Sequence, residues 1–202
     1  RGIAGRSYQL SVSTGEGELV ESALDELMPG LKIQSIDAEL EHKDDPDLFY
    51  GRDGYQFYLN TETPASKDNY ILWRLQTTYK FRTDYGIFSY IDKNGQYQLM
   101  ASGDSLRTCY KNADVLKILL LNTSDFAKPE IKHYPLYYED NYTKALSIRY
   151  SLKVNQYTIN ESAFNYYNTI KKISESGENL YTTQPYQVAN NLKNVTHPDK
   201  PV

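Results

Sequence analysis

Hydrophobic and polar residues alternate along several stretches of the chain, the pattern of β-strands with one buried and one solvated face. The longest stretch covers residues 70–82, where Ile71, Trp73 and Leu75 point one way and Leu72 and Arg74 the other. Shorter alternating or apolar stretches predict further strands at residues 33–41, 54–60, 114–121 and 150–158. The chain is therefore expected to be mainly β, an antiparallel sheet or sandwich.

The period of the pattern changes after residue 158. From Ala163 to Ile173 the apolar residues recur at steps of three and four, which predicts a helix near residues 159–175 with one apolar stripe. Thr158 and Glu161 have the spacing of a capping box at its start. The stripe favours a helix that covers one face of the sheet. The alternative is a ligand or partner groove lined by two residues of the helix, Tyr166 and Tyr167.

Turn residues divide the remaining sequence. Asn94 followed by Gly95 predicts a turn within residues 87–98, in a hairpin or a loop. Residues 41–47 are rich in charge and are expected to form a loop. Residues 122–145 are expected to be a long loop with an extended piece, because Pro129 and Pro135 interrupt any longer element.

A boundary is predicted at Pro29 and Gly30, a turn dipeptide between two differently patterned stretches. Before it, two short alternating stretches flank a glycine-rich turn. Two strands cannot form a stable domain by themselves, so residues 1–30 are interpreted as the last strands of a preceding domain. Residues 31–202 are interpreted as one β-rich C-terminal domain that contains the helix near 159–175.

Composition narrows the choice of function. The chain has 202 residues and a net charge of −4, with Lys and Arg scattered, so the sequence does not favour nucleic-acid binding. Its 20 tyrosines suit both cross-strand packing and recognition surfaces. No apolar run is long enough to cross a membrane as a helix. The single cysteine, Cys109, is either a buried thiol or the partner of a cysteine outside this stretch.

Signatures of catalysis are missing from the sequence. The three histidines, His42, His133 and His197, have no metal-ligand spacing, and no nucleophile elbow or phosphate-binding glycine loop occurs. The acidic residues at 44, 45 and 47 lack the spacing of a calcium loop and favour a solvated turn. We therefore predict no catalytic residue, cofactor or metal. A carboxylate pair of the glycosidase kind stays open, because such a pair cannot be found in one sequence.

The C-terminal run of residues 150–202 carries a family resemblance. It contains Val154-Asn-Gln-Tyr157, the aromatic helix, and a segment from Gly177 to Leu180 followed by Pro185 and by residues 188–194. This run resembles the C-terminal signature of a Bacteroidota lipoprotein family known as domain-of-unknown-function family 4249. Weaker agreement lies in residues 70–74 and 109–110, so the resemblance extends along nearly the whole chain.

The resemblance implies a cellular location and a kind of partner, but no catalytic reaction. Residues 1–30 would be the closing hairpin of an immunoglobulin-like sandwich, and a lipidated cysteine would lie upstream of this sequence. The protein would be lipid-anchored at the cell-surface side of the outer membrane. It would be a non-catalytic accessory subunit of a TonB-dependent β-barrel transporter or a larger outer-membrane complex, with a role in ligand capture, gating or scaffolding. The alternatives are a free-standing glycan- or peptide-binding surface module and an extracellular hydrolase.

A surface location in such bacteria also implies O-glycosylation at Asp-Ser/Thr triplets. The chain has one such triplet, residues 104–106, and Gly103 before it predicts an exposed turn. Ser105 is therefore a candidate O-glycosylation site. The alternative is coincidence, because Asp-Ser pairs are common in turns for their own hydrogen-bonding reasons.

Overall fold

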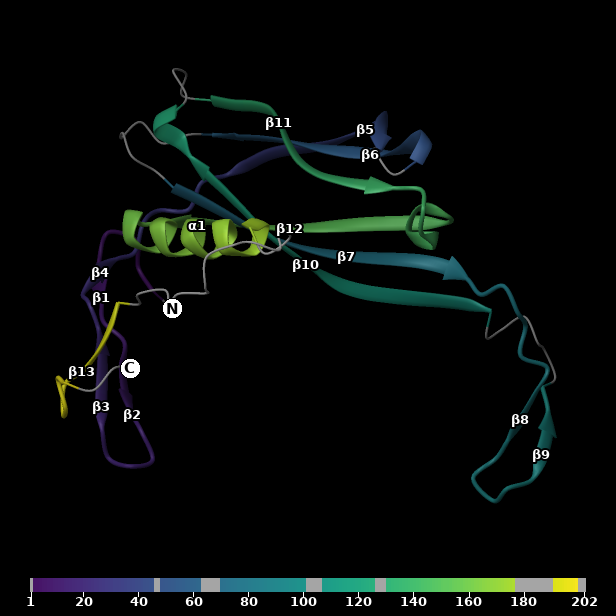
Figure 1. Ribbon diagram of the computed structural model, residues 1–202, viewed down its shortest axis with the longest axis horizontal. Coiled ribbons are helices and arrows are strands. Elements are labelled where there is room, and N and C mark those ends of the chain that lie inside the picture. The colour runs from purple at the N-terminus through teal and green to yellow at the C-terminus, as the bar shows by residue number, and fades with distance from the viewer. Residues whose placement is uncertain are drawn as a thin grey trace.

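Two three-stranded antiparallel sheets form the centre of the molecule (Figure 1). The computed structural model describes residues 2–45, 48–62, 70–100, 107–125, 130–176 and 191–199. These residues form mainly antiparallel strands and one α-helix, which confirms the predicted fold class.

The first sheet, called the central sheet below, has the strand order β10-β7-β12. Its middle strand β7 spans Tyr70–Arg82, as the alternation predicts, and it pairs with β10 (Thr108–Asn122) and β12 (Arg149–Ile159). Strand β10 begins six residues before the predicted strand at 114–121. Its first half mixes polar and apolar residues on both faces, so a hydrophobic pattern could not reveal it.

The second sheet has the order β11-β6-β5, with β5 at Ile33–Asp45, β6 at Leu48–Glu62 and β11 at Glu130–Asp140. One prediction was wrong here. The charged stretch from residue 41 is not a loop, because β5 continues to Asp45. The extended piece predicted within residues 122–145 is β11, a strand of 11 residues.

Proline is tolerated in β11 because this strand lies at the edge of its sheet and pairs only with β6. The register shifts on both sides of Pro135, between Ile131 and Tyr134 and again between Pro135 and Tyr137. Within the first irregularity His133 adopts a positive φ of 54° and stacks on Tyr58 of β6. These bulges interrupt the pairing of β11 with β6 on both sides of Pro135, the residue that has no backbone N–H to donate. Short 3-10 turns, Thr123–Asp125 and Lys144–Leu146, flank β11 along the chain.

The core lies between the two sheets. It contains Ile71, Trp73 and Leu75 from the predicted apolar face of β7, packed against Leu59 and Ile131 of the second sheet. Trp73 is 1% exposed and stacks on Tyr134 of β11, with ring centroids 5.2 Å apart. Large rings from facing strands therefore help to fill the layer between the sheets, although many other tyrosines of the described residues are exposed.

Helix α1 (Glu161–Ser176) covers part of the outer face of the central sheet and contacts β7 and β10. Phe164 lies against Tyr70 at a centroid distance of 4.7 Å, and Leu72, on the same strand face, is buried. The predicted helix is confirmed, but its cap was wrong. Thr158 is still in β12, and Asn160 caps the helix, because its Oδ1 accepts from the N–H of Ala163 at 2.7 Å.

Short strands near both ends of the chain form two smaller sheets. One pairs β1 (Ser7–Tyr8) with β4 (Asp25–Glu26), and the other has the order β13-β3-β2, with β2 at Ser11–Ser13, β3 at Leu19–Ser22 and β13 at Leu192–Asn194. The N-terminal hairpin therefore pairs with a late segment of its own chain. The proposed division between residues 1–30 and 31–202 stays a prediction, and this pairing crosses it.

Two projections extend from the same side of the central layers and give the molecule the shape of an arch (Figure 1). One is the group of terminal sheets. The other is a hairpin of β8 (Ser89–Ile91) and β9 (Tyr97–Leu99), which turns at Asn94-Gly95 as predicted. We call residues 84–100 the β8–β9 arm.

Candidate functional site

A pocket of about 460 Å³ lies on the outer face of the central sheet, beside α1. An irregularity in β10 shapes it. Val115 is opposite Leu75 and Leu119 is opposite Trp73, so three residues of β10 stand against Arg74 alone. Such a bulge turns side chains away from regular pairing and is common next to binding sites. Leu116, in the bulge, is 92% exposed.

Polar side chains of all three strands line the floor of this pocket. In the register of the sheet Asp114 of β10 and Lys153 of β12 both lie opposite Gln76 of β7, and Asn155 lies opposite Arg74. Directly opposed residues share a face of a sheet. These five side chains therefore stand together on the outer face, and Gln76 donates from Nε2 to Asp114 Oδ1 over 3.1 Å.

The two helix tyrosines predicted to contact a ligand or partner differ in position. Tyr167 lines the pocket, and its hydroxyl accepts a hydrogen bond from Nη2 of Arg74 at 3.3 Å. Tyr166 is 37% exposed and meets the Tyr167 ring edge-on, but it is outside the pocket lining. Their role in binding stays a prediction. The sequence carried two weak signals for the rest of the pocket. One is the polar face of the strand at residues 70–82, which includes Arg74 and Gln76, and the other is Lys117, which interrupts the apolar run from 115 to 121.

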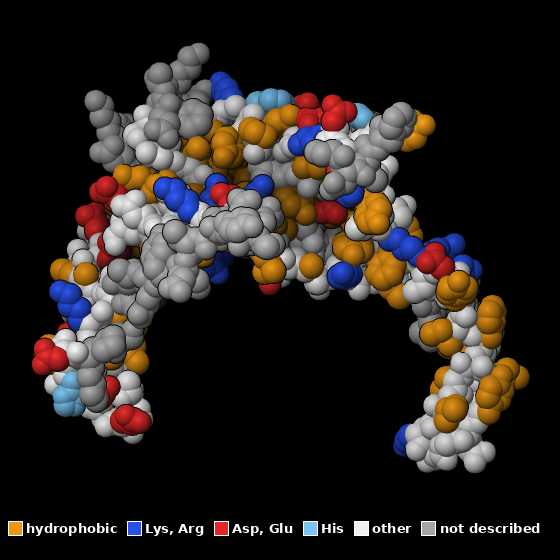
Figure 2. Space-filling view, in the orientation of Figure 1, with side chains coloured by type: hydrophobic (Ala, Val, Ile, Leu, Met, Phe, Trp, Pro, Cys, Tyr) orange, Lys and Arg blue, Asp and Glu red, His pale blue; other side chains and the backbone are white. Residues whose placement is uncertain are grey.

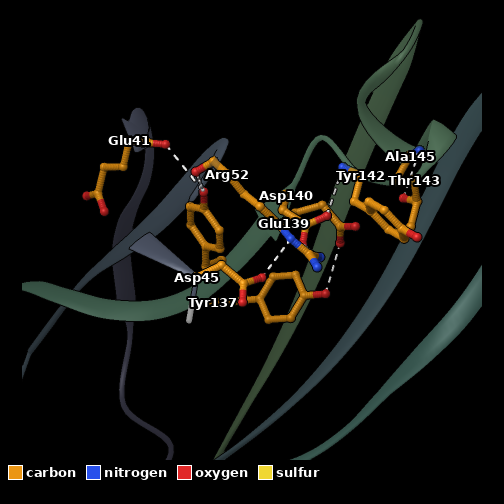
Figure 3. Close-up of polar contacts among 10 residues, drawn as sticks. Glu41, Asp45, Arg52, Tyr137, Glu139, Asp140, Tyr142, Thr143 and Ala145 are labelled. Atoms are coloured by element: carbon orange, nitrogen blue, oxygen red, sulfur yellow. Dashed lines mark hydrogen bonds and ion pairs between the residues drawn. The ribbon is translucent and has the colours of Figure 1, made fainter. Parts of the chain in front are cut away.

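A second polar group lies at the end of the second sheet (Figure 3). The guanidinium of Arg52 forms ion pairs with Asp45 and Asp140, each at 2.9 Å, and lies over the ring of Tyr142. The hydrogen bond to Asp140 raises the pKa of Arg52. One guanidinium thus joins β5, β6 and the end of β11.

Glu139, the residue before Asp140 in β11, accepts hydrogen bonds from two tyrosines. Tyr137 and Tyr150 both donate their hydroxyls to its Oε2 at 2.9 Å. Burial, followed by contact with the Glu139 carboxylate, raises the pKa of both tyrosines. In β6 the hydrogen bond to Glu41 raises the pKa of Tyr58 to about 12. The carboxylates and hydroxyls of these contacts are paired with one another, an arrangement that stabilises the packing of the strands.

The β8–β9 arm carries apolar side chains with little cover. Tyr97 and Leu99 pair directly with Ile91 and Ser89, so Ile91, Tyr97 and Leu99 share one face. Their exposed fractions are 73%, 67% and 75%. On the opposite face Phe88 and Tyr90 are also exposed. Figure 2 shows hydrophobic side chains gathered along this projection.

The other predicted residues are less informative. Ser105 lies outside the described residues. Cys109 is half-buried in β10, opposite Phe81, and its pairing with a cysteine elsewhere stays a prediction. Of the acidic residues weighed for calcium, Asp45 pairs with Arg52. In the described parts of the chain, no three His, Cys, Asp or Glu side chains are grouped as for a metal ion.

The comparisons with known proteins agree with the resemblance in the sequence. A family model, Domain of unknown function (DUF4249), matches residues 1–202. The chain belongs to the DUF4249 family. Comparisons with curated proteins and with solved structures gave no match. No helix among the described residues of this DUF4249 protein is both long and apolar enough to cross a membrane.

Proposed function

We propose that this DUF4249 protein is a non-catalytic accessory subunit of an outer-membrane complex and docks through its β8–β9 arm. The partner is a β-barrel transporter of the TonB-dependent kind. The protein is lipid-anchored on the cell-surface side of a Bacteroidota outer membrane through a segment upstream of this sequence. Its work is to capture ligand for the transporter, to gate it or to scaffold the complex.

The observation that supports this proposal most is the exposed apolar face of Ile91, Tyr97 and Leu99. An isolated two-stranded hairpin is marginal in water, and contiguous exposed apolar side chains usually mark an interaction site. In the described part of the chain, β8 and β9 pair only with each other, so both outer edges are open for strand addition. The partner surface is therefore expected to offer apolar side chains beside an extended strand.

Charge in the arm also favours protein contact. Its three charged residues are Asp84, Asp92 and Lys93. Asp84 is paired with Lys144, and Asp92 accepts three hydrogen bonds within its own turn. Lys93 lies in the turn, outside both strands, so the face of Ile91, Tyr97 and Leu99 contains no charged residue. Burying this face removes no charge of its own from water, which keeps the desolvation cost of docking low.

Photo-crosslinking in the native outer membrane tests the proposal. A photoreactive residue at Leu99 should crosslink to a β-barrel protein, and mild-detergent purification should recover the two in a fixed ratio. Leu116 is the control, because it is a leucine on the central sheet that is even more exposed than Leu99. Equal crosslinking from both positions, or recovery of the protein alone, would contradict the docking role.

A free-standing glycan- or peptide-binding module is the second candidate. The pocket beside Tyr167 favours it, because the pocket combines an aromatic ring with amides and charges. A consistently monomeric protein from native membranes that binds glycan would support this candidate over the subunit.

A further inference from the structure

The pocket on the central sheet has a charge opposite to that of the protein. Arg74, Lys117 and Lys153 line it together with one carboxylate, Asp114, which leaves two positive charges in the pocket of a chain with net charge −4. Among the described residues, none of these three cations forms an ion pair with a carboxylate. Arg74 uses one N–H on Tyr167 and has further donors to offer.

From these contacts we propose that the pocket binds an acidic sugar, a hydroxylated ring that carries a carboxylate. The cations recognise the carboxylate, since Arg and Lys bind carboxylates through charge-assisted hydrogen bonds. Asp114 accepts from ring hydroxyls, and the amide of Asn155 donates to and accepts from them. The ring of Tyr167 closes one side with apolar surface.

Asp114 is the reason to prefer an acidic sugar over a simple anion. Its carboxylate stands in the same row as Lys153 and would repel a compact dianion such as inorganic phosphate. A sugar separates its carboxylate from its hydroxyls, so one end can meet the cations while the other meets Asp114. The volume of about 460 Å³ is that of a small-ligand site.

This inference does not rest on docking through the β8–β9 arm. It concerns a different face of the chain, and the purified protein tests it without a membrane. The two proposals can therefore fail separately.

Calorimetric titration of the purified full chain with three probes tests the inference. Digalacturonate should bind, while the neutral disaccharide cellobiose and inorganic phosphate should bind clearly more weakly. Removing two cations with R74Q and K153Q together should weaken digalacturonate binding roughly tenfold or more, since hydrogen bonds to charged groups are the strong ones. K193Q, which removes an exposed lysine in β13, is the control and should bind like wild type.

The variant D114N separates an acidic-sugar site from a general anion site. It should weaken digalacturonate binding and strengthen phosphate binding, because a charged acceptor of sugar hydroxyls becomes a weaker, neutral one and the charge that repels phosphate is removed. All these side chains are exposed or half-buried, and unchanged fluorescence of Trp73 would show that the variants fold. Phosphate binding as tight as that of digalacturonate, unchanged binding by the double variant, or no binding of any probe would overturn the proposal.

Discussion

Trp73 donates its indole N–H to the side-chain oxygen of Gln156 over 2.7 Å. The two residues face each other across β7 and β12. The amide nitrogen of Gln156 then donates to Thr61 Oγ1 at 3.1 Å and to the carbonyl of Leu31 at 3.2 Å. Thr61 is fully buried in β6 of the second sheet. A hydrogen-bonded path therefore links the two sheets through the core.

Replacing Gln156 by leucine should destabilise the protein by about 1–3 kcal/mol, because the Trp73 N–H would be left without a partner in the core. Urea unfolding followed by tryptophan fluorescence measures this directly, since Trp73 is the only tryptophan. The same substitution at the exposed Gln34 is the control and should change stability by about 0.5 kcal/mol or less. Equal effects at both positions would contradict an energetic role for the path.

Gly54 sits where β6 meets β11 too closely for a side chain. A Cβ at this position would meet the carbonyl of Glu139 and the ring of Tyr138. Gly54→Ala should therefore push the two strands apart and cost about 1–3 kcal/mol in urea unfolding. Gly15→Ala is the matched control, because a Cβ there meets open space and its φ is not positive. If G54A were as stable as G15A in urea, β11 would be able to move away from β6 without loss of folding free energy, which would contradict this prediction.

Sequence patterns predicted the elements whose burial differs between faces. The bounds of strand β7 were predicted correctly, because Ile71, Trp73 and Leu75 face the core while Arg74 faces water. Strand β11 was predicted only as an extended piece of a loop, because Pro135 is a poor strand residue that is tolerated here at the edge of a sheet. The wrong cap at Thr158 arose because β12 continues to Ile159.

The candidate site was less predictable than the fold. Tyr167 was singled out from the helix pattern, but Arg74, Asp114 and Lys153 come from three strands far apart in the sequence. Their proximity depends on the order and register of the central sheet, which alternation does not encode. The bulge that leaves Leu116 exposed depends on pairing in the same way.

Asn194 lies in β13 opposite Val20 of β3 and is 6% exposed. Its Nδ2 donates to Glu18 at 3.2 Å, and its Oδ1 accepts from the N–H of His197 at 2.8 Å. Asn194→Ala removes both bonds, each worth about 1 kcal/mol, and should open β13 locally. Hydrogen exchange of the β3 amides should then become roughly tenfold faster or more, while Asn191→Ala, an exposed control, leaves it unchanged. Unchanged exchange in N194A would mean that backbone pairing alone holds β13.

The turn of the β8–β9 arm should be sensitive to acid through Asp92. Its carboxylate accepts from the backbone N–H groups of Gln96 and Asn94 and from the side chain of Gln98, at 2.8–3.0 Å. These bonds, that of Gln96 first, lower the pKa of Asp92 below its ordinary value of 3.8. A folded-state pKa below the unfolded one means that the charged carboxylate stabilises the turn above pH 3.8. That stabilisation is lost as the pH falls through the lower, folded-state pKa.

Amide exchange and chemical shifts of Gly95 and Gln96, measured by NMR from about pH 6 to about pH 2, should show the turn loosening at the acid end. Amides of β7 in the core serve as the internal reference and should stay protected over the same range. The variant Asp92→Asn keeps the shape of the side chain but cannot titrate. Its turn should already be loosened at neutral pH and should not change further with acid. If D92N titrates like wild type, another group controls the arm, and the Asp92 turn has no part in its acid response.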